Sequence, residues 1–278
     1  IAMDDKPSVA VRRGKKSSMW LAIDAVRMGH ACAVVSAGNT GALMAMSKLI
    51  LRTLPGISRP AIAALFPTLR GECVMLDLGA NVESSAEDLY RFAIMGDAFA
   101  RAVLGLSRPR IGLLNVGAEE LKGRDEVKQA RQLIEQSETK LNFHGFIEGN
   151  DIAVGTVDVV VTDGFTGNVS LKTAEGIAKM VNHMLKQELM RSVRGKLGGA
   201  IAKPAFKTLK DRVDPDVFGG APLVGLKGVC VIAHGGSRHT AVKNAIRVAC
   251  DMVRADVVGK IEKSFRPKSL DIEVQAAK

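Results

Sequence analysis

The chain has 278 residues, of which 47% are hydrophobic, 24% charged and only 4% aromatic. This apolar fraction is enough to fill a core, so the composition excludes a mainly disordered chain. The formal charge of +10 indicates an anionic partner: nucleic acid, an anionic membrane, an acidic protein or a phosphorylated substrate. No apolar run has membrane-spanning length and the chain shows no signal-peptide core, so we expect a cytoplasmic protein.

Short β-branched runs alternate with helical periods along the whole chain. The spacing of apolar residues predicts five helices. One ends near Leu51, one covers 86–104, one ends near Gln136, one begins after Asn168 and one covers 242–257. Ser84 and Glu87 have the spacing of a capping box. The alternation predicts an α/β fold with a mostly parallel sheet and helices on both faces. The runs that predict its strands are 31–37, 61–67, 73–79, 110–117, 142–148, 157–164 and 228–236.

One segment departs from this alternation. Residues 177–212 are helical in period, with breaks expected at Gly198, Gly199 and Pro204. Nine Lys and Arg against two Asp and Glu give this segment a charge of +7, which is most of the net charge. We predict a basic helical excursion from a single α/β domain that spans 1–278, and a loose tail at 266–278.

Polar, glycine-rich turns follow five of the predicted strands. Ligands of open parallel sheets bind beyond the carboxyl ends of the strands, so we expect these turns to meet at one edge of the sheet. Their backbone N–H groups, amides and hydroxyls suit a phosphate. Each turn taken alone is also compatible with an ordinary turn that caps a helix. The candidate residues are Ser36, Gly38, Asn39, Thr40, Asp77, Gly79, Asn81, Lys122, Asp163, Asn168, His234 and Gly235.

The usual signatures of nucleotide and covalent chemistry are absent. The chain has no Walker A loop, no G-x-G-x-x-G after a strand and no G-x-S-x-G elbow. Its four cysteines and five histidines lack metal-ligand spacing, and we expect the cysteines to be core residues. No serine or cysteine has a neighbouring base. The site is therefore predicted to hold an anion that is itself a reactant.

Four of the candidate residues could have either a structural role or a role in binding or catalysis. Lys122 suits contact with an anion or an ordinary surface position. Asp163 suits a helix cap or the orientation of a catalytic group, and Asn168 also suits a cap. His234 suits a general base or a hydrogen-bonded structural histidine. The residues alone leave these alternatives open.

Several long motifs resemble the PlsX family of phosphate acyltransferases, in order and over nearly the whole chain. They are "SAGNTGALM", "DLGANV", "AIMGDAFA", "LLNVGAEELKG" and "VVVTDGFTGNVSLKTAEG". The resemblance implies a dimer with a fold similar to the isocitrate and isopropylmalate dehydrogenases and the phosphotransacetylases. It implies transfer of a fatty acyl group from acyl carrier protein to inorganic phosphate, which yields acyl phosphate for phospholipid synthesis, without a metal or cofactor.

The resemblance also implies roles for particular residues. Lys122 and Asn168 match the family's functional Lys and Asn, and Asp163 is expected to orient them. The turns 36–40 and 77–81 complete the phosphate site. The family's further N-terminal stretch, with its "DAMGGD" strand end, is absent, so we expect an N-terminally incomplete domain. The basic excursion would dock the acidic carrier, or an anionic membrane surface, through Lys186, Arg191, Arg194 and Lys196.

Other functions remain as alternatives. A phosphate acetyltransferase-like enzyme would take its acyl group from acyl-CoA. A nicotinamide dehydrogenase on the same fold is less favoured, because its metal-binding carboxylate set is not evident. A nucleic-acid-binding protein fits the charge, but one Trp and one Tyr without aromatic–basic interleaving offer poor stacking platforms, so no nucleic acid is expected.

Overall fold

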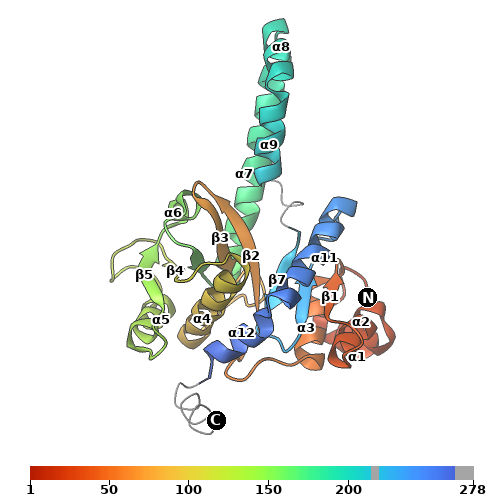
Figure 1. Ribbon diagram of the computed structural model, residues 1–278, viewed down its shortest axis with the longest axis vertical. Coiled ribbons are helices and arrows are strands. Elements are labelled where there is room, and N and C mark those ends of the chain that lie inside the picture. Colours follow the sequence, from red (N-terminus) through yellow and green to blue (C-terminus); the bar gives the residue numbers. More distant parts are fainter. Residues whose placement is uncertain (214–218, 267–278) are drawn as a thin grey trace.

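The computed structural model describes residues 1–213 and 219–266, with the side chains of 210–213 left out of the description. One eight-stranded sheet runs through the chain in the order β1-β8-β7-β2-β3-β6-β4-β5 (Figure 1). The strands are β1 (Ala33–Ser36), β2 (Ala61–Thr68), β3 (Gly71–Leu76), β4 (Arg110–Leu114), β5 (Asn142–Ile147), β6 (Val159–Val161), β7 (Ala221–Val224) and β8 (Val229–Ile232). Each of the seven predicted runs overlaps one strand, although β3 begins two residues before its run, and β7 was not predicted.

The sheet is mixed, with two groups of parallel strands. β1 and β8 are parallel, and so are β3, β6, β4 and β5. Between the groups, β7 and β2 pair antiparallel with each other and with their outer neighbours, so the two groups run in opposite directions. The prediction that five turns meet at one edge is therefore wrong. A tight hairpin between β2 and β3 and the unpredicted strand β7 reverse the chain direction.

Helices cover both faces of the sheet, as predicted. Val159 and Val161 pack into one buried cluster and Val160 into the other, because successive side chains of a strand point to opposite faces. One face carries α4 (Ala86–Val103), α5 (Asp125–Gln136), α11 (His239–Arg254) and α12 (Val257–Ser264). The other carries α1 (Pro7–Arg13), α2 (Ser18–Arg27), α3 (Thr40–Ile50), α6 (Gly149–Val154) and the start of α7 (Gly164–Met190).

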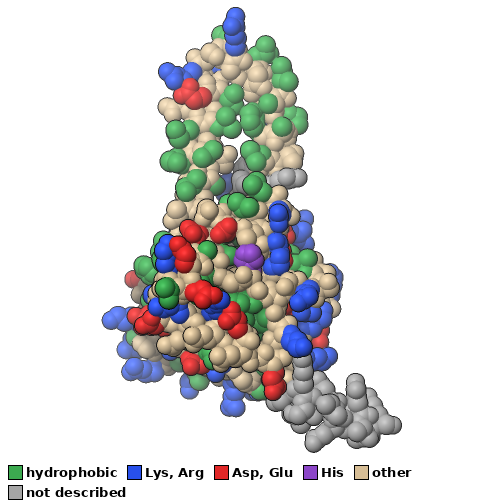
Figure 2. Space-filling view, turned by 90° about the vertical axis from the view of Figure 1, so that its left-hand side faces the viewer, with side chains coloured by type: hydrophobic (Ala, Val, Ile, Leu, Met, Phe, Trp, Pro, Cys, Tyr) green, Lys and Arg blue, Asp and Glu red, His purple; other side chains and the backbone are tan. Residues whose placement is uncertain are grey.

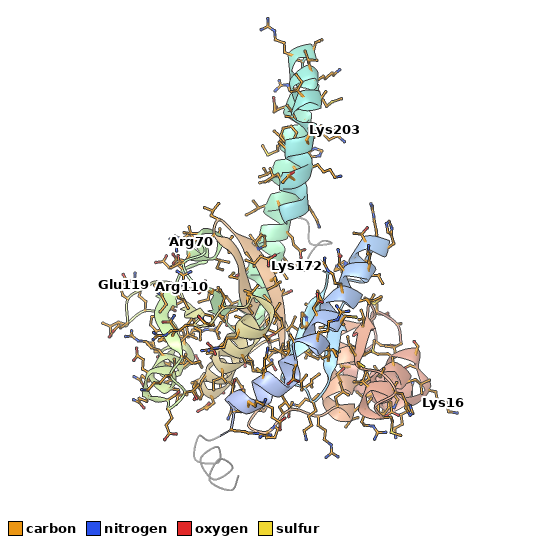
Figure 3. All side chains as sticks on the ribbon, viewed as in Figure 1. Lys16, Arg70, Arg110, Glu119, Lys172 and Lys203 are labelled. Atoms are coloured by element: carbon orange, nitrogen blue, oxygen red, sulfur yellow. The ribbon has the colours of Figure 1, made fainter. Side chains whose placement is uncertain are left out.

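Three helices form an arm that projects far beyond the sheet (Figure 1). The 27 residues of α7 lead into α8 (Val193–Ile201) and α9 (Lys203–Val213). Figure 3 shows Lys172 where α7 leaves the sheet and Lys203 well along the arm. The helix breaks fall at Ser192, which caps α8, and at Ala202. Gly198 and Gly199 lie inside α8 instead, because glycine costs a helix only about 1 kcal/mol.

Pro204 lies in the first turn of α9, where its missing N–H group has no helical partner to lose. It therefore begins a helix rather than breaking one.

Other helix ends also differ from the sequence patterns. The capping box of α4 uses Ser85 and Asp88, one residue after the predicted pair. The C-terminal helical pattern is divided at Asp256, which adopts a left-handed conformation with φ 47° and caps α12. α1 and α2 were not predicted. Apart from Arg266, the predicted tail lies outside the described residues.

The first turn of α7 lies directly on the loop that follows β3. The N–H group of Gly164 donates to the carbonyl oxygen of Asn81 at 2.8 Å. A Cβ atom at Gly164 would lie 2.5 Å from that same oxygen. A Cβ at Gly167 would overlap the carbonyl oxygen of Asp77. Glycine at both positions therefore permits the close approach of α7 to this loop.

This contact predicts opposite effects of one substitution at two glycines of α7. Gly167→Ala should lower the free energy of unfolding by about 2–3 kcal/mol, because backbone atoms must move to admit the methyl group. Gly176→Ala is the matched control, since nothing lies within 4 Å of a Cβ there. It should raise stability by about 0.5–1 kcal/mol through helix propensity. Urea denaturation measures both, and equal effects would contradict the close approach.

Candidate functional site

The loop after β3 is organised around the carboxylate of Asp77, which is fully buried. Its Oδ1 accepts from the backbone N–H groups of Ile62 at 2.9 Å, Gly79 at 3.2 Å and Ala80 at 3.0 Å. Its Oδ2 accepts from the backbone and side-chain N–H groups of Asn81 at 2.7 and 2.9 Å. Burial raises the pKa of Asp77, and these N–H donors oppose the increase. The backbone N–H groups that we expected to face a phosphate are therefore bonded to Asp77.

Two predicted asparagines also hold the chain together. Asn81 donates its second amide N–H group to the carbonyl oxygen of Pro60, at 2.9 Å. Asn39 caps α3 by accepting from the Ala42 N–H group at 2.9 Å. Its Nδ2 donates to carbonyl oxygens of the N-terminal segment, including those of Met3 and Asp5, both at 2.9 Å. The structure gives the N–H groups of both side chains structural partners, which leaves none for an external anion.

Asp163 is buried and caps α7. Its Oδ1 accepts from the Thr166 N–H group at 2.8 Å, and its Oδ2 accepts from the Thr166 hydroxyl at 2.9 Å and forms an ion pair with Arg124. Arg124 was missed by the sequence analysis. It follows β4 and Asp163 follows β6, and only the pairing of those two strands brings the residues together.

Asn168 lies one turn inside α7, so it is not the cap. Its side chain is exposed and has no hydrogen bond within the described residues. It lies beside the Asp77 loop, because a Cβ built on Gly79 would be 3.8 Å from Asn168 Oδ1. The amide of Asn168 is therefore available to a ligand at this loop.

Lys122 lies in the loop after β4, where its ammonium group bonds Glu119 Oε1 at 2.7 Å. This bond raises the pKa of Lys122 and lowers that of Glu119. The Asn115 amide closes the loop by donating to the Lys122 carbonyl oxygen at 3.0 Å. Lys122 follows the same group of parallel strands as Asp163 and Asn168, but no hydrogen bond or ion pair of the described residues joins it to either. The three predicted catalytic residues thus share an edge of the sheet without forming one cluster.

The loops after β1 and β8 form a second group. Ser36 Oγ accepts from the Gly38 N–H group at 3.2 Å, and His234 Nδ1 accepts from the Gly236 N–H group at 3.1 Å. A Cβ on Gly235 would lie 3.6 Å from the carbonyl oxygen of Ala37, so these two loops are neighbours. The ring of His234 has a structural partner on the side of Nδ1.

A cavity of about 560 Å³ connects α3 with the Asp77 loop. Its wall includes Thr40 and Lys48 of α3, Arg59 before β2, and Gly79 and Asn81 of the loop. A larger cavity of about 1050 Å³ lies at the other end of β3, beside the β2–β3 hairpin, α4 and α11, where β2 no longer pairs with β7. Its lining is mostly apolar and includes none of the predicted site residues. The smaller cavity is therefore the better candidate for the polar site.

The two buried cysteines, Cys73 and Cys230, are not activated as nucleophiles. Burial raises the pKa of Cys73 to about 12 and that of Cys230 to about 11, so both are thiols at neutral pH. Cys32 and Cys250 are exposed, which contradicts their predicted core positions. Within residues 1–213 and 219–266, no three His, Cys, Asp or Glu side chains are grouped to hold a metal ion. No helix in those ranges has the length and hydrophobicity to cross a bilayer.

Comparison with known proteins identifies the family. A family model described as "Fatty acid synthesis protein" matches residues 1–260. The chain belongs to this family. It is 58% identical to the phosphate acyltransferase of Rhodospirillum centenum, covering 91% of this chain and 71% of that protein. It is 52% identical to the phosphate acyltransferase of Paramagnetospirillum magneticum, covering 95% and 76%. These matches agree with the family that the sequence motifs resemble.

Solved structures support the fold of this family member. A phosphotransacetylase from Streptococcus pyogenes superposes with a TM-score of 0.55 at 16% identity, covering 94% of this chain and 75% of that one. A branched-chain phosphotransacylase from Enterococcus faecalis gives a TM-score of 0.53 at 18% identity, covering 84% and 78%. At these identities the likeness concerns the α/β fold alone.

Proposed function

We propose that this chain transfers a fatty acyl group from acyl carrier protein to inorganic phosphate, which yields acyl phosphate for phospholipid synthesis. The observation that carries the proposal is the 58% identity, over most of the chain, to a protein named phosphate acyltransferase. The site adds physical support, because it offers side-chain amide and cationic groups that suit an anionic reactant. The buried cysteines of the chain are not activated as nucleophiles, which fits a direct attack by phosphate.

The proposed reaction needs no covalent enzyme intermediate. A phosphate oxygen attacks the thioester carbonyl carbon, and the new C–O bond leaves a tetrahedral oxyanion. Collapse of this intermediate breaks the C–S bond, and the carrier's thiolate leaves and takes up a proton. The enzyme's task is to align two anionic reactants and to stabilise the oxyanion.

We assign the polar roles to residues at the edge formed by β3, β6 and β4. Asn168 donates its free amide N–H groups to phosphate or to the oxyanion. Lys122 supplies positive charge, with Glu119 holding its ammonium group. Asp163 acts as a positioning residue, because it fixes Arg124 and the first turn of α7. The turn 77–81 adjoins these residues, and Thr40 of the turn 36–40 lines the cavity beside it. The rest of the turn 36–40 and the turn 234–235 follow β1 and β8, which run in the opposite direction, so they lie outside this edge.

Exposed apolar side chains follow the same three strands, and they fit the acyl part of the substrate. Val82 follows β3, Val116 and Leu121 follow β4, and Phe165 lies in the first turn of α7 after β6. Leu121 is 91% exposed, but a single exposed leucine is common on protein surfaces, so the proposal rests on the four side chains together. We propose that these side chains contact the fatty acyl chain.

We propose that the arm serves carrier docking and dimer formation. Its basic residues Lys186, Arg191, Arg194 and Lys196 would attract the acidic carrier. Its exposed apolar side chains are grouped along the helices (Figure 2). Those of α7 recur at the three- and four-residue spacing of one helix face: Ile177, Met180, Val181 and Met184. Burial of this face against a second copy of the chain would form a homodimer.

Further proposals follow from the family resemblance. The fold would be similar to that of the isocitrate and isopropylmalate dehydrogenases, and the chain would form one domain with the arm as a basic excursion. The protein would act in the cytoplasm, with the tip of the arm as a point of peripheral membrane contact.

A phosphotransacetylase-like use of acyl-CoA is the competing function, favoured only by the structural likeness. Comparing kcat/KM for palmitoyl-acyl carrier protein and palmitoyl-CoA at fixed phosphate separates the two. The proposal expects the carrier to be preferred by at least about tenfold, because only the carrier engages the basic arm. Equal or higher kcat/KM with the CoA donor would favour the alternative.

Lys122→Ala should lower kcat for acyl phosphate formation about 100-fold or more, as expected for a lost charged donor in an acyl-transfer site. The fold should be unaffected, because the side chain is exposed. Lys128→Ala is the matched control, since Lys128 makes the same i,i+3 pair with Asp125 on the next helix. Near-normal kcat in Lys122→Ala would remove Lys122 from the mechanism.

Reversing two arginines of the arm, in Arg191→Glu/Arg194→Glu, should raise KM for the acylated carrier about tenfold and leave KM for phosphate unchanged. Increasing salt should reduce the difference from the wild type. Lys15→Glu/Lys16→Glu is the control, because it changes the net charge equally at exposed residues of the N-terminal helices (Figure 3). An unchanged KM for the carrier would show that the basic arm is merely a solvated surface.

A further inference from the structure

The candidate site holds less free positive charge than a phosphate substrate requires. The N–H groups of the loop after β3 are bonded to Asp77, and the ammonium of Lys122 is paired with Glu119. Arg124 is paired with Asp163. An entering phosphate would therefore meet the buried carboxylates of Asp77 and Asp163, and the N–H groups and the cation beside them are already engaged. Other cations have to supply the remaining charge.

Two such cations line the cavity of about 560 Å³: Lys48 of α3 and Arg59 before β2. Both side chains are exposed, and neither has a hydrogen bond or an ion pair among the described residues. Some other surface cations are engaged with acids, as Arg27 is with Asp24 and Arg131 with Glu135, and are less available to an anion. Two unpaired cations on the wall of one cavity are a suitable arrangement for an anion.

The backbone beside Arg59 is held firmly in place. The carbonyl oxygen of Pro60 accepts from Asn81 Nδ2 at 2.9 Å, and the N–H group of Ile62 donates to Asp77 at 2.9 Å. The side chain of Arg59 therefore extends from a fixed position of the backbone beside the Asp77 loop. Its guanidinium group can bind two phosphate oxygens at once, whereas the Lys48 ammonium acts as a compact charge.

Neutral donors complete the cavity. Thr40 lies on its wall, and Gly79, also on the wall, adjoins the free amide of Asn168. We infer that Lys48 and Arg59 bind the phosphate co-substrate in this cavity and present it beside Asn168. The inference rests on the proposed function for the identity of the anion, and on the cavity and its unpaired cations for the site.

The test measures phosphate binding separately from catalysis. Arg59→Gln, Lys48→Gln and the double variant are titrated with inorganic phosphate by calorimetry, without any acyl donor. Each single variant should raise the Kd for phosphate about tenfold and the double variant further, in keeping with the loss of charged hydrogen bonds. KM for phosphate should rise in parallel, with KM for the acylated carrier unchanged.

Matched controls are Arg108→Gln and Lys140→Gln, which remove exposed, unpaired cations outside the cavity. Their Kd for phosphate should equal that of the wild type. An unchanged Kd in Arg59→Gln and Lys48→Gln overturns the inference. A rise in KM for the carrier alone also overturns it, because the two cations would then bind the carrier or its phosphopantetheine.

The two proposals can fail separately. If the wild type forms acyl phosphate and the variants keep normal phosphate affinity, the function holds and the inference fails. If phosphate binding depends on Arg59 and Lys48 but no acyl phosphate forms, the phosphate site holds and the proposed function fails.

Discussion

The carboxylate of Asp77 is the group on which the site's architecture depends. It accepts five N–H groups, from the start of β2 and from the loop after β3, and thereby fixes that loop against the sheet. α7 can then approach this loop only through Gly164 and Gly167. Because β6 and α7 carry Asp163 and Asn168, one buried carboxylate positions three of the elements that build the candidate site.

This arrangement has an electrostatic consequence. A loop that would otherwise bind an external anion through its N–H groups instead encloses a carboxylate of its own. Positive charge therefore has to come from side chains on other elements, which are far apart in the sequence. Lys48 and Arg59 lie on one side of the cavity, and Lys122 and Arg124 follow β4 at the edge of the sheet. The cations and the rigid loop thus have separate roles, attraction and positioning.

Much of the fold could be predicted from local patterns. The apolar runs are continuous because buried strands contact helices on both faces, and each predicted run overlaps a strand. β7 was missed because its short run "APLV" follows two glycines and contains a proline. Its omission hid the reversal of direction across the sheet, which local sequence does not encode.

The site was less predictable than the fold. Sequence distinguished the polar turns but not the partners within them, so Asn39, Asn81 and Asp163 could be read as ligands or as structural groups. The structure gives all three structural hydrogen bonds. The pair of Arg124 and Asp163 depends on the pairing of β4 with β6, and the cavity depends on the packing of α3 against the loop after β3.

The central claim is that phosphate attacks the acyl carbon directly. Incubation of the protein with palmitoyl-acyl carrier protein and fully ¹⁸O-labelled phosphate, followed by mass spectrometry, tests it. The account predicts palmitoyl phosphate that retains all four labelled oxygens, because a phosphate oxygen attacks the acyl carbon, together with a protein whose mass shows no added acyl group during turnover. Release of free palmitate without acyl phosphate, or an acyl group held covalently on the protein, would contradict it.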